Sequence, residues 1–201
     1  MIKMTRHASL AALTLALAAC GGSTGPYGLP EGAFWSQLTA LCGKAYEGRV
    51  TTDYSADRDW KYQRLILDVA ACSADGVVMN FNIDEDRTRT WTVTPQPGGA
   101  IGYHIGRAEG TGPGVTGYGG ISSEGPDALA QVFPIDEASK ALFESIDLTF
   151  STQNVWSLTF DAEAETFTYH VQRMGSERSI EFDLSEAVPV EKPEGWEPAE
   201  F

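Results

Sequence analysis

The sequence predicts an all-β fold: a single antiparallel meander of strands closed into a barrel, with an open β-sandwich as the alternative. The 201 residues include 21 glycines, 10 prolines, 5 Trp, 7 Tyr and 9 Phe, a composition that favours strands and turns over a helical bundle. Short runs of alternating apolar and polar residues are separated by turn residues, as between successive strands. Because almost no helix is left to connect parallel strands, neighbouring strands should pair antiparallel. Closure into a barrel would remove the exposed edges.

The expected strands cover most of the chain after residue 44. We place them at about 45–52, 62–71, 76–84, 88–95, 100–107, 115–122, 129–134, 146–151, 154–161, 165–172 and 178–184. In four of them the apolar residues alternate on one face: Val77, Met79, Phe81 and Ile83; Trp156, Leu158 and Phe160; Phe167, Tyr169 and Val171; and Ile180, Phe182 and Leu184. This period of two predicts that these faces point into the core. Glycines within 117–120 should permit a sharp bend of the barrel.

Two short helices are expected besides the strands. Phe34, Leu38 and Leu41 recur at helical spacing and are followed by Gly43, which suits a helix end. Asp136 is a good N-cap for a second short helix at 137–144.

The first 19 residues have the pattern of an export signal. Lys3 and Arg6 precede an apolar run at 10–19 that is too short to span a bilayer. The sequence Leu17-Ala18-Ala19-Cys20 then resembles the lipobox of bacterial lipoproteins. The resemblance implies cleavage before Cys20 and acylation of its sulfur, which would anchor the protein in a membrane. A conventionally cleaved signal with an incidental thiol is the alternative.

The lipoprotein resemblance also implies a location and a domain plan. Gly21 stands where inner-membrane lipoproteins commonly carry Asp, so we expect a bacterial envelope protein on the outer membrane, facing the periplasm. The chain then divides into a signal peptide (1–19), the lipidated Cys20 with a flexible tether (20–30), a β-barrel domain (31–188) and an extended acidic C-terminal tail (189–201).

The barrel order gives a second resemblance. An N-terminal helix followed by eight to ten strands is similar to the calycins, which include lipocalins, fatty-acid-binding proteins and nitrobindin-like barrels, and implies a calycin-like barrel by analogy. A third resemblance, to an uncharacterised family of bacterial secreted proteins, supplies no activity, ligand or catalytic residue. It rests on Phe34-Trp35, Leu41-Cys42-Gly43-Lys44-Ala45-Tyr46-Glu47-Gly48, Asp86-Arg87-Thr88-Arg89-Thr90-Trp91 and Asn154-Val155-Trp156.

The charge of the chain limits its partners. With 14 Lys and Arg against 28 Asp and Glu, the formal net charge is −14. Nucleic-acid binding needs a basic face that neutralises phosphates, so nucleic acid is not an expected partner. The membrane is expected as a partner through the lipid anchor alone.

Cys42 and Cys72 are predicted to form a disulfide. They remain as an even pair in an exported chain once Cys20 is assigned to the anchor. The bridge would close a loop of about 30 residues and contribute roughly 3.6 kcal/mol in the chain-entropy model. Zinc binding is disfavoured, because the chain has no CxxC or HxxxH spacing around His104 and His170.

A candidate ligand site lies on two neighbouring expected strands. Arg89 and Trp91 share one face of the first, and Tyr103 and Arg107 share one face of the second. If these faces point inward, the four side chains would hold the carboxylate or phosphate of a ligand. In the alternative, Arg87 and Arg89 lie at the barrel rim, where they pair with Asp84, Glu85 or Asp86 and stack on Trp91.

The sequence predicts no catalytic residue, metal ligand or cofactor. Ser122 and Ser123 lack a nucleophile-elbow motif, and no haem or metal motif surrounds His104 or His170. The favoured function is a tethered binding protein for a small apolar or amphiphilic ligand in a barrel cavity. The alternative is a structural or protein-interaction module of the envelope with a filled core. An enzyme is the least favoured class.

Replacement of Cys20 tests the lipid anchor. We expect Cys20→Ser to yield an unprocessed precursor or a protein without acyl chains, because serine lacks the sulfur that the lipobox enzymes modify. Mass spectrometry of the native mature N-terminus measures this, and an unmodified terminus at any other residue would contradict it.

Overall fold

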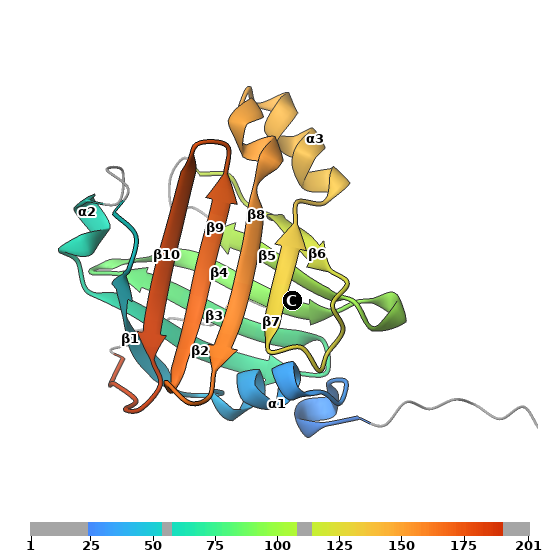
Figure 1. Ribbon diagram of the computed structural model, residues 1–201, viewed down its shortest axis with the longest axis vertical. Helices are drawn as coiled ribbons and strands as arrows, with labels where there is room; N and C mark the ends of the chain where they lie inside the picture. The colour runs from blue at the N-terminus through green and yellow to red at the C-terminus, as the bar shows by residue number, and fades with distance from the viewer. Residues whose placement is uncertain (1–23, 54–57, 108–113, 191–201) are drawn as a thin grey trace, which may run out of the picture.

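Ten antiparallel strands form one sheet that curls into a nearly closed barrel (Figure 1). The computed structural model describes residues 24–53, 58–107 and 114–190. The strands are β1 (Ala45–Val50), β2 (Leu65–Ser73), β3 (Gly76–Ile83), β4 (Asp86–Pro95), β5 (Ile101–Arg107), β6 (Tyr118–Ser122), β7 (Ala130–Pro134), β8 (Val155–Asp161), β9 (Thr166–Arg173) and β10 (Ser176–Asp183). The predicted all-β, calycin-like meander with few helices is confirmed.

The sheet is a meander joined through its first and last strands. Its order is β6-β5-β4-β3-β2-β1-β10-β9-β8-β7, so every strand except β6 and β7 has two ladder neighbours. β1 pairs with β10 in the register Gly48↔Phe182. In Figure 1, β7 to β10 cross in front of β2 to β5, with the core between them. This arrangement is the barrel of the prediction and not the open sandwich.

The remaining edges, β6 and β7, meet at a short seam. Gly120 forms a single bridge with Ile135, and the Asp136 N–H donates to the Gly119 carbonyl oxygen at 3.1 Å. A Cβ on Gly120 would collide with the Pro134 carbonyl oxygen, so only glycine allows this approach.

Side chains complete the seam where the backbones no longer pair. The Val132 N–H donates to Glu124 Oε2 at 3.1 Å, and Ser122 Oγ donates to Gln131 Oε1 at 2.7 Å. Both bonds satisfy groups that an open edge would expose.

Helix α1 (Ala33–Ala40) closes one end of the barrel. Phe34, Trp35 and Leu38 are buried on its inner side, and the Phe34 ring lies 5.6 Å from that of Phe160 in an edge contact. The disulfide Cys42–Cys72, with Cα atoms 6.2 Å apart, joins the end of this helix to β2. The predicted helix and the predicted disulfide are both present.

Two further helices lie away from α1: α3 stands at the top of the view in Figure 1, and α2 lies at its left. The first turn of α3 (Glu137–Ser145) is capped as predicted, because the Ser139 N–H donates to Asp136 Oδ1 at 2.7 Å. The single turn α2 (Arg58–Lys61) was not predicted. The strand expected at 62–71 begins after it, at Leu65. None of the helices in the described ranges is long and apolar enough to span a membrane.

Two expectations are corrected. The strand expected at 146–151 is absent; the chain instead leaves α3 through Asp147, at φ 59°, and enters a 3₁₀ turn at Thr149–Gln153. A positive φ breaks a strand, so the strand expected at 146–151 was wrong. Residues 24–30, expected as flexible tether, fold against the barrel: Thr24 bridges to Pro30, and Leu29 is fully buried. Cys20 and residues 191–201 lie outside the described residues.

Reduction of the disulfide should destabilise the protein. We expect a loss of about 2–5 kcal/mol in the free energy of unfolding, because reduction frees the loop between Cys42 and Cys72 in the unfolded chain. Urea unfolding with and without reductant measures this difference. Alkylation of the unfolded, unreduced protein should label neither cysteine, and two labelled thiols would rule the bridge out.

Asp136 gives the stability a pH dependence. Burial disfavours its carboxylate, but hydrogen bonds from Ser139 and His104 outweigh burial and lower its pKa below the ordinary value. The stability that ionised Asp136 gives to the folded protein is therefore fully present above the pKa of about 3.9 that an aspartate has in the unfolded chain. This stability is lost as the pH falls through the lower pKa of Asp136 in the folded protein. Asp136→Ala should cost about 1–2 kcal/mol at pH 7, with a smaller difference at pH 3. The neighbouring Glu137→Ala is the control in urea unfolding, because its side chain is 88% exposed. An Asp136→Ala loss that stays constant with pH would contradict the assignment.

Candidate functional site

Two of the four predicted ligand residues lie in the core. Trp91 is 2% exposed, and its ring stacks between those of Phe81 and Tyr169 at centroid distances of 4.8 and 4.5 Å. Tyr103 is fully buried, with its ring 5.4 Å from that of Phe133. Neither Trp91 nor Tyr103 lines any of the cavities described below. The structure places both in the packing of the interior.

Aromatic rings occupy the rest of the interior. Phe167 lies 4.8 Å from Phe160 and 6.2 Å from Phe182, and Phe182 lies 6.4 Å from Trp91. These ring contacts extend from Phe34 of α1 to the middle of the barrel. None of the cavities described below is enclosed by these rings. They lie at the ends of the barrel or on its outer faces, and the candidate site is sought among them.

The other two predicted residues, Arg89 and Arg107, lie at the end of the barrel opposite α1. They are register partners across β4 and β5 and share the inward face of these strands. Together with Arg173 from the end of β9 they line a cavity of about 280 Å³, which we call the arginine mouth. Its other walls include Tyr118, Phe143, Leu148 and Asn154.

A smaller cavity of about 160 Å³ adjoins the arginine mouth. The two cavities share Ile105, Tyr118, Asn154 and Arg173, and the smaller one reaches Arg178 at the start of β10. Four of the 14 basic residues of an acidic chain therefore gather at one end of the barrel.

The charge at the arginine mouth is only partly balanced. Arg89 forms an ion pair with Asp86 at 2.5 Å, as the rim alternative predicted. Among the described residues, neither Arg107 nor Arg173 has a carboxylate within ion-pair distance; Arg173 Nε donates to Ser176 Oγ at 3.1 Å. Like charges directly opposite in a sheet are destabilising. A bound carboxylate or phosphate would remove this repulsion by accepting paired hydrogen bonds.

Trp60 of α2 holds two of the guanidinium groups. The Arg178 group lies 3.9 Å from the centroid of the Trp60 ring, and the Arg89 group lies 5.6 Å from it. The ring itself rests against Phe81 at 5.6 Å. The stacking partner of Arg89 is therefore Trp60 and not Trp91. Such cation–π contacts fix the orientation of the guanidinium groups without neutralising them.

Two phenol groups complete the site. Burial raises the pKa of Tyr118, and the charges of Arg107, Arg89 and Arg173 oppose the rise without cancelling it. Burial also raises the pKa of Tyr169, which lines the smaller cavity. Both hydroxyls therefore stay protonated at neutral pH and can donate to an anion. Asn154 is 7% exposed and its Oδ1 has no partner among the described residues. The anionic group of a ligand only accepts hydrogen bonds, so this oxygen would need a hydroxyl or N–H elsewhere on the ligand.

Apolar side chains border the arginine mouth. Leu148 is 42% exposed and lines it together with Phe143 and Val115. A ligand with an anionic group and a short apolar body would contact both kinds of surface.

Sequence reasoning missed Arg173, Arg178, Trp60 and Tyr118, although a signal existed for the two arginines. Arg173 continues the inward alternation of Tyr169 and Val171, and Arg178 precedes the inward Ile180 by two residues. Extending these patterns to the strand ends would have placed both side chains at the mouth. Nothing in the sequence placed Trp60 beside them.

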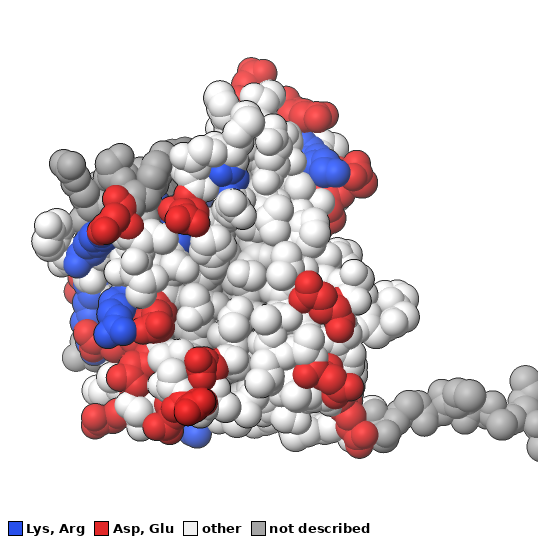
Figure 2. All heavy atoms as spheres, viewed as in Figure 1, with Lys and Arg blue, Asp and Glu red and all other residues white. Residues whose placement is uncertain are grey.

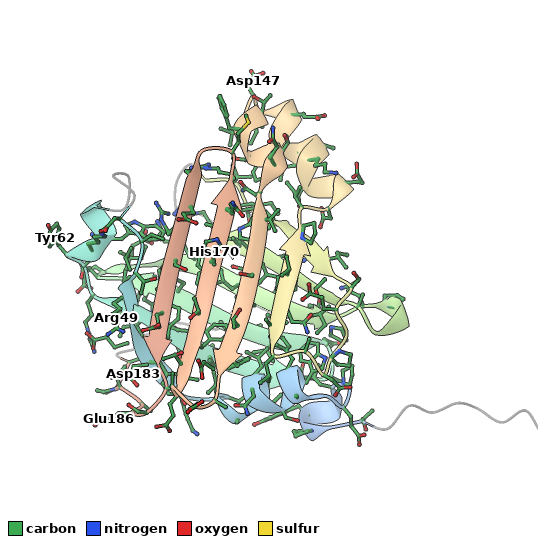
Figure 3. All side chains as sticks on the ribbon, in the orientation of Figure 1. Arg49, Tyr62, Asp147, His170, Asp183 and Glu186 are labelled. Carbon is green, nitrogen blue, oxygen red and sulfur yellow. A yellow bond between two sulfur atoms is a disulfide. The ribbon has the colours of Figure 1, made fainter. Side chains whose placement is uncertain are left out.

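A larger cavity, about 540 Å³, lies on the outside of the sheet and has a different character. Glu47, Glu181 and Asp183 line it, and Arg49 in its wall pairs with Glu181 at 2.5 Å. Figure 3 shows Asp183 at the lower end of β10 and Arg49 above it, on the neighbouring strand β1. Acidic side chains dominate that part of the surface in Figure 2. Among the described residues, no group of three or more His, Cys, Asp and Glu is arranged to hold a metal ion.

The two histidines of the described chain have structural partners. His104 Nε2 lies 2.8 Å from Asp136 Oδ2 at the β6–β7 seam. His170 faces outward from β9 (Figure 3), with Nδ1 3.1 Å from Ser179 Oγ on β10. Each ring therefore ties neighbouring elements together.

Comparison with known proteins identifies no relative. No protein-family model matches the chain, and neither a curated protein nor a solved structure is significantly similar to it. The resemblances to lipoproteins and to an uncharacterised secreted family therefore stay predictions.

Proposed function

We propose that this protein is a lipid-anchored protein of the bacterial envelope that binds a small anionic ligand at the arginine mouth. One observation carries the proposal: Arg89 and Arg107 face each other across β4 and β5 and, with Arg173, line a cavity of about 280 Å³. An otherwise acidic chain gains nothing in stability from opposing two guanidinium groups. Binding of an anion is the simplest use for them.

The ligand class follows from the walls of the cavity. Guanidinium groups and neutral phenols suit a carboxylate or a phosphate. The volume is below the range of roughly 300–1,000 Å³ typical of sites that enclose drug-sized ligands, so it suits a head group and a short apolar body against Leu148. The ligand would thus bind at the mouth of the barrel and not in a cavity inside it, as the sequence predicted, because aromatic rings fill the interior.

The anchor is proposed from the lipobox resemblance of Leu17-Ala18-Ala19-Cys20. Acylated Cys20 would hold the domain at a membrane, and Gly21 favours the periplasmic side of the outer membrane. The membrane is then a partner through the lipid, and nucleic acid is not a partner.

A structural or protein-interaction module of the envelope is the second candidate. The filled core favours it, because a barrel that carries apolar molecules needs interior space. In that case the role of Arg89 is limited to its ion pair with Asp86 and its cation–π contact with Trp60, and no small anion binds.

Calorimetric titration separates the two candidates. The protein would be residues 20–201 with Cys20→Ser, titrated with decyl phosphate, decanoate and, as a charge control, decyltrimethylammonium. We expect at least one anion to bind and the cation not to bind.

Arg107→Gln should weaken anion binding at least tenfold, or about 1.4 kcal/mol, without loss of stability, because the substitution relieves the repulsion with Arg89. Arg49→Gln, on the outer surface, should bind as the parent does. Binding that Arg107→Gln leaves unchanged would exclude the mouth as the site, and no binding of either anion would favour the structural module.

A further inference from the structure

Three exposed apolar side chains lie next to the arginine mouth. Leu148 is part of its wall and is also 42% exposed. Phe150 is 68% exposed and precedes Ser151, which lines the mouth. Met174 is 64% exposed and follows Arg173, which lines it as well. We call Leu148, Phe150 and Met174 the apolar rim. Side chains of these types are usually buried, and exposed ones that gather beside a cavity are typical of a binding surface.

Backbone hydrogen bonds hold the apolar rim in place. The Leu148 N–H donates to the Phe143 carbonyl oxygen at 2.8 Å, at the end of α3. The Ser151 N–H donates to the Leu148 carbonyl oxygen at 2.9 Å, and the 3₁₀ turn Thr149–Gln153 contacts β9. Met174 lies in the tight turn between the paired strands β9 and β10. A surface that is already ordered loses little conformational entropy when a ligand covers it.

The apolar rim offers a path for a chain attached to a head group in the mouth. The interior below the mouth is filled, because the rings of Trp91 and Tyr169 stack at 4.5 Å. The mouth itself holds about 280 Å³, which is below the range typical of sites that enclose a whole ligand. Leu148 belongs both to the wall of the mouth and to the rim, so the two surfaces are continuous there.

We propose that the ligand of the arginine mouth is a single-chain anionic amphiphile, whose head group binds the guanidinium groups and whose chain lies over the apolar rim. This inference rests on the proposed function and adds chain length as the property that the protein selects. Arg107 and Arg173 would donate to the head group. Each methylene that contacts Phe150 or Met174 would remove apolar area from water, so affinity should rise with chain length.

The charge of the neighbouring tip favours a single molecule over a bilayer surface. Asp147, which directly precedes Leu148, stands at the top of the molecule in Figure 3. Figure 2 shows acidic side chains at the same place. An anionic bilayer that approached the rim would meet these carboxylates, and like charges repel. An amphiphile in solution reaches the guanidinium groups without bringing a charged surface to the tip.

Two chain lengths, measured with and without the rim, test the inference. Residues 20–201 with Cys20→Ser would be titrated with hexyl phosphate and decyl phosphate, each below its critical micelle concentration. We expect decyl phosphate to bind at least tenfold more tightly, because four further methylenes would each lose about half of their contact with water. Phe150→Ser combined with Met174→Ser should weaken decyl phosphate binding at least fivefold and hexyl phosphate binding less than twofold. Both side chains are mostly exposed, so stability should change little.

Tyr27→Ser is the matched control for this variant. Tyr27 is 53% exposed in the 3₁₀ turn Pro26–Gly28, which contacts α1 at the opposite end of the barrel. The substitution removes a comparable exposed apolar side chain away from the mouth. It should leave the binding of both phosphates as in the parent.

The outcomes separate this inference from the proposed function. If the two phosphates bind equally well, or if the double variant leaves their ratio unchanged, the chain does not use the rim and the inference fails, while the mouth remains an anion site. If neither phosphate binds, the proposed function fails and the inference fails with it. Binding to phosphatidylglycerol vesicles that the double variant abolishes, without a chain-length effect in solution, would make a bilayer the occupant of the rim and overturn the inference.

Discussion

The closure of the sheet is the constraint on which the other features depend. Pairing of β1 with β10 joins the two halves of the meander, but the edges β6 and β7 meet only because Gly120 lets the chain pass against Pro134. Side-chain hydrogen bonds replace backbone pairing beyond this point: Glu124 accepts from the Val132 N–H, and Gln131 accepts from the Ser122 hydroxyl. Asp136 serves the seam twice, because it caps α3 and also contacts His104 of β5.

Closure determines where a ligand can bind. Ten strands bring large inward side chains from all sides, and the resulting ring contacts leave the ends of the barrel as the sites for polar chemistry. One end is closed by α1. At the other end of the barrel, the ends of the strands carry arginines on their inward faces, directly after the inward apolar residues of the same strands. The same alternation that builds the core therefore places the guanidinium groups at the mouth.

The sequence predicted most of the fold and half of the candidate site. Strict alternation, as in Trp156, Leu158 and Phe160, placed those strands correctly, since one buried face leaves a period of two. The strand expected at 146–151 was wrong, because Asp147 takes a left-handed conformation that turns the chain. Arg89 and Arg107 were placed together because they lie on adjacent strands. Trp60 could not be placed, because its contact with Arg178 depends on long-range packing.

The folding of residues 24–30 against the closed end sets the orientation that a lipid on Cys20 would impose. The bridge from Thr24 to Pro30 holds Thr24 against the segment that leads into α1, and the four peptide steps from Cys20 span at most about 14 Å. The base of the barrel would then rest near the bilayer, while the guanidinium groups would stand about one strand length, roughly 25 Å, farther out. An anchored molecule would thus sample solutes of the surrounding aqueous compartment and would not extract lipid from the leaflet that holds it.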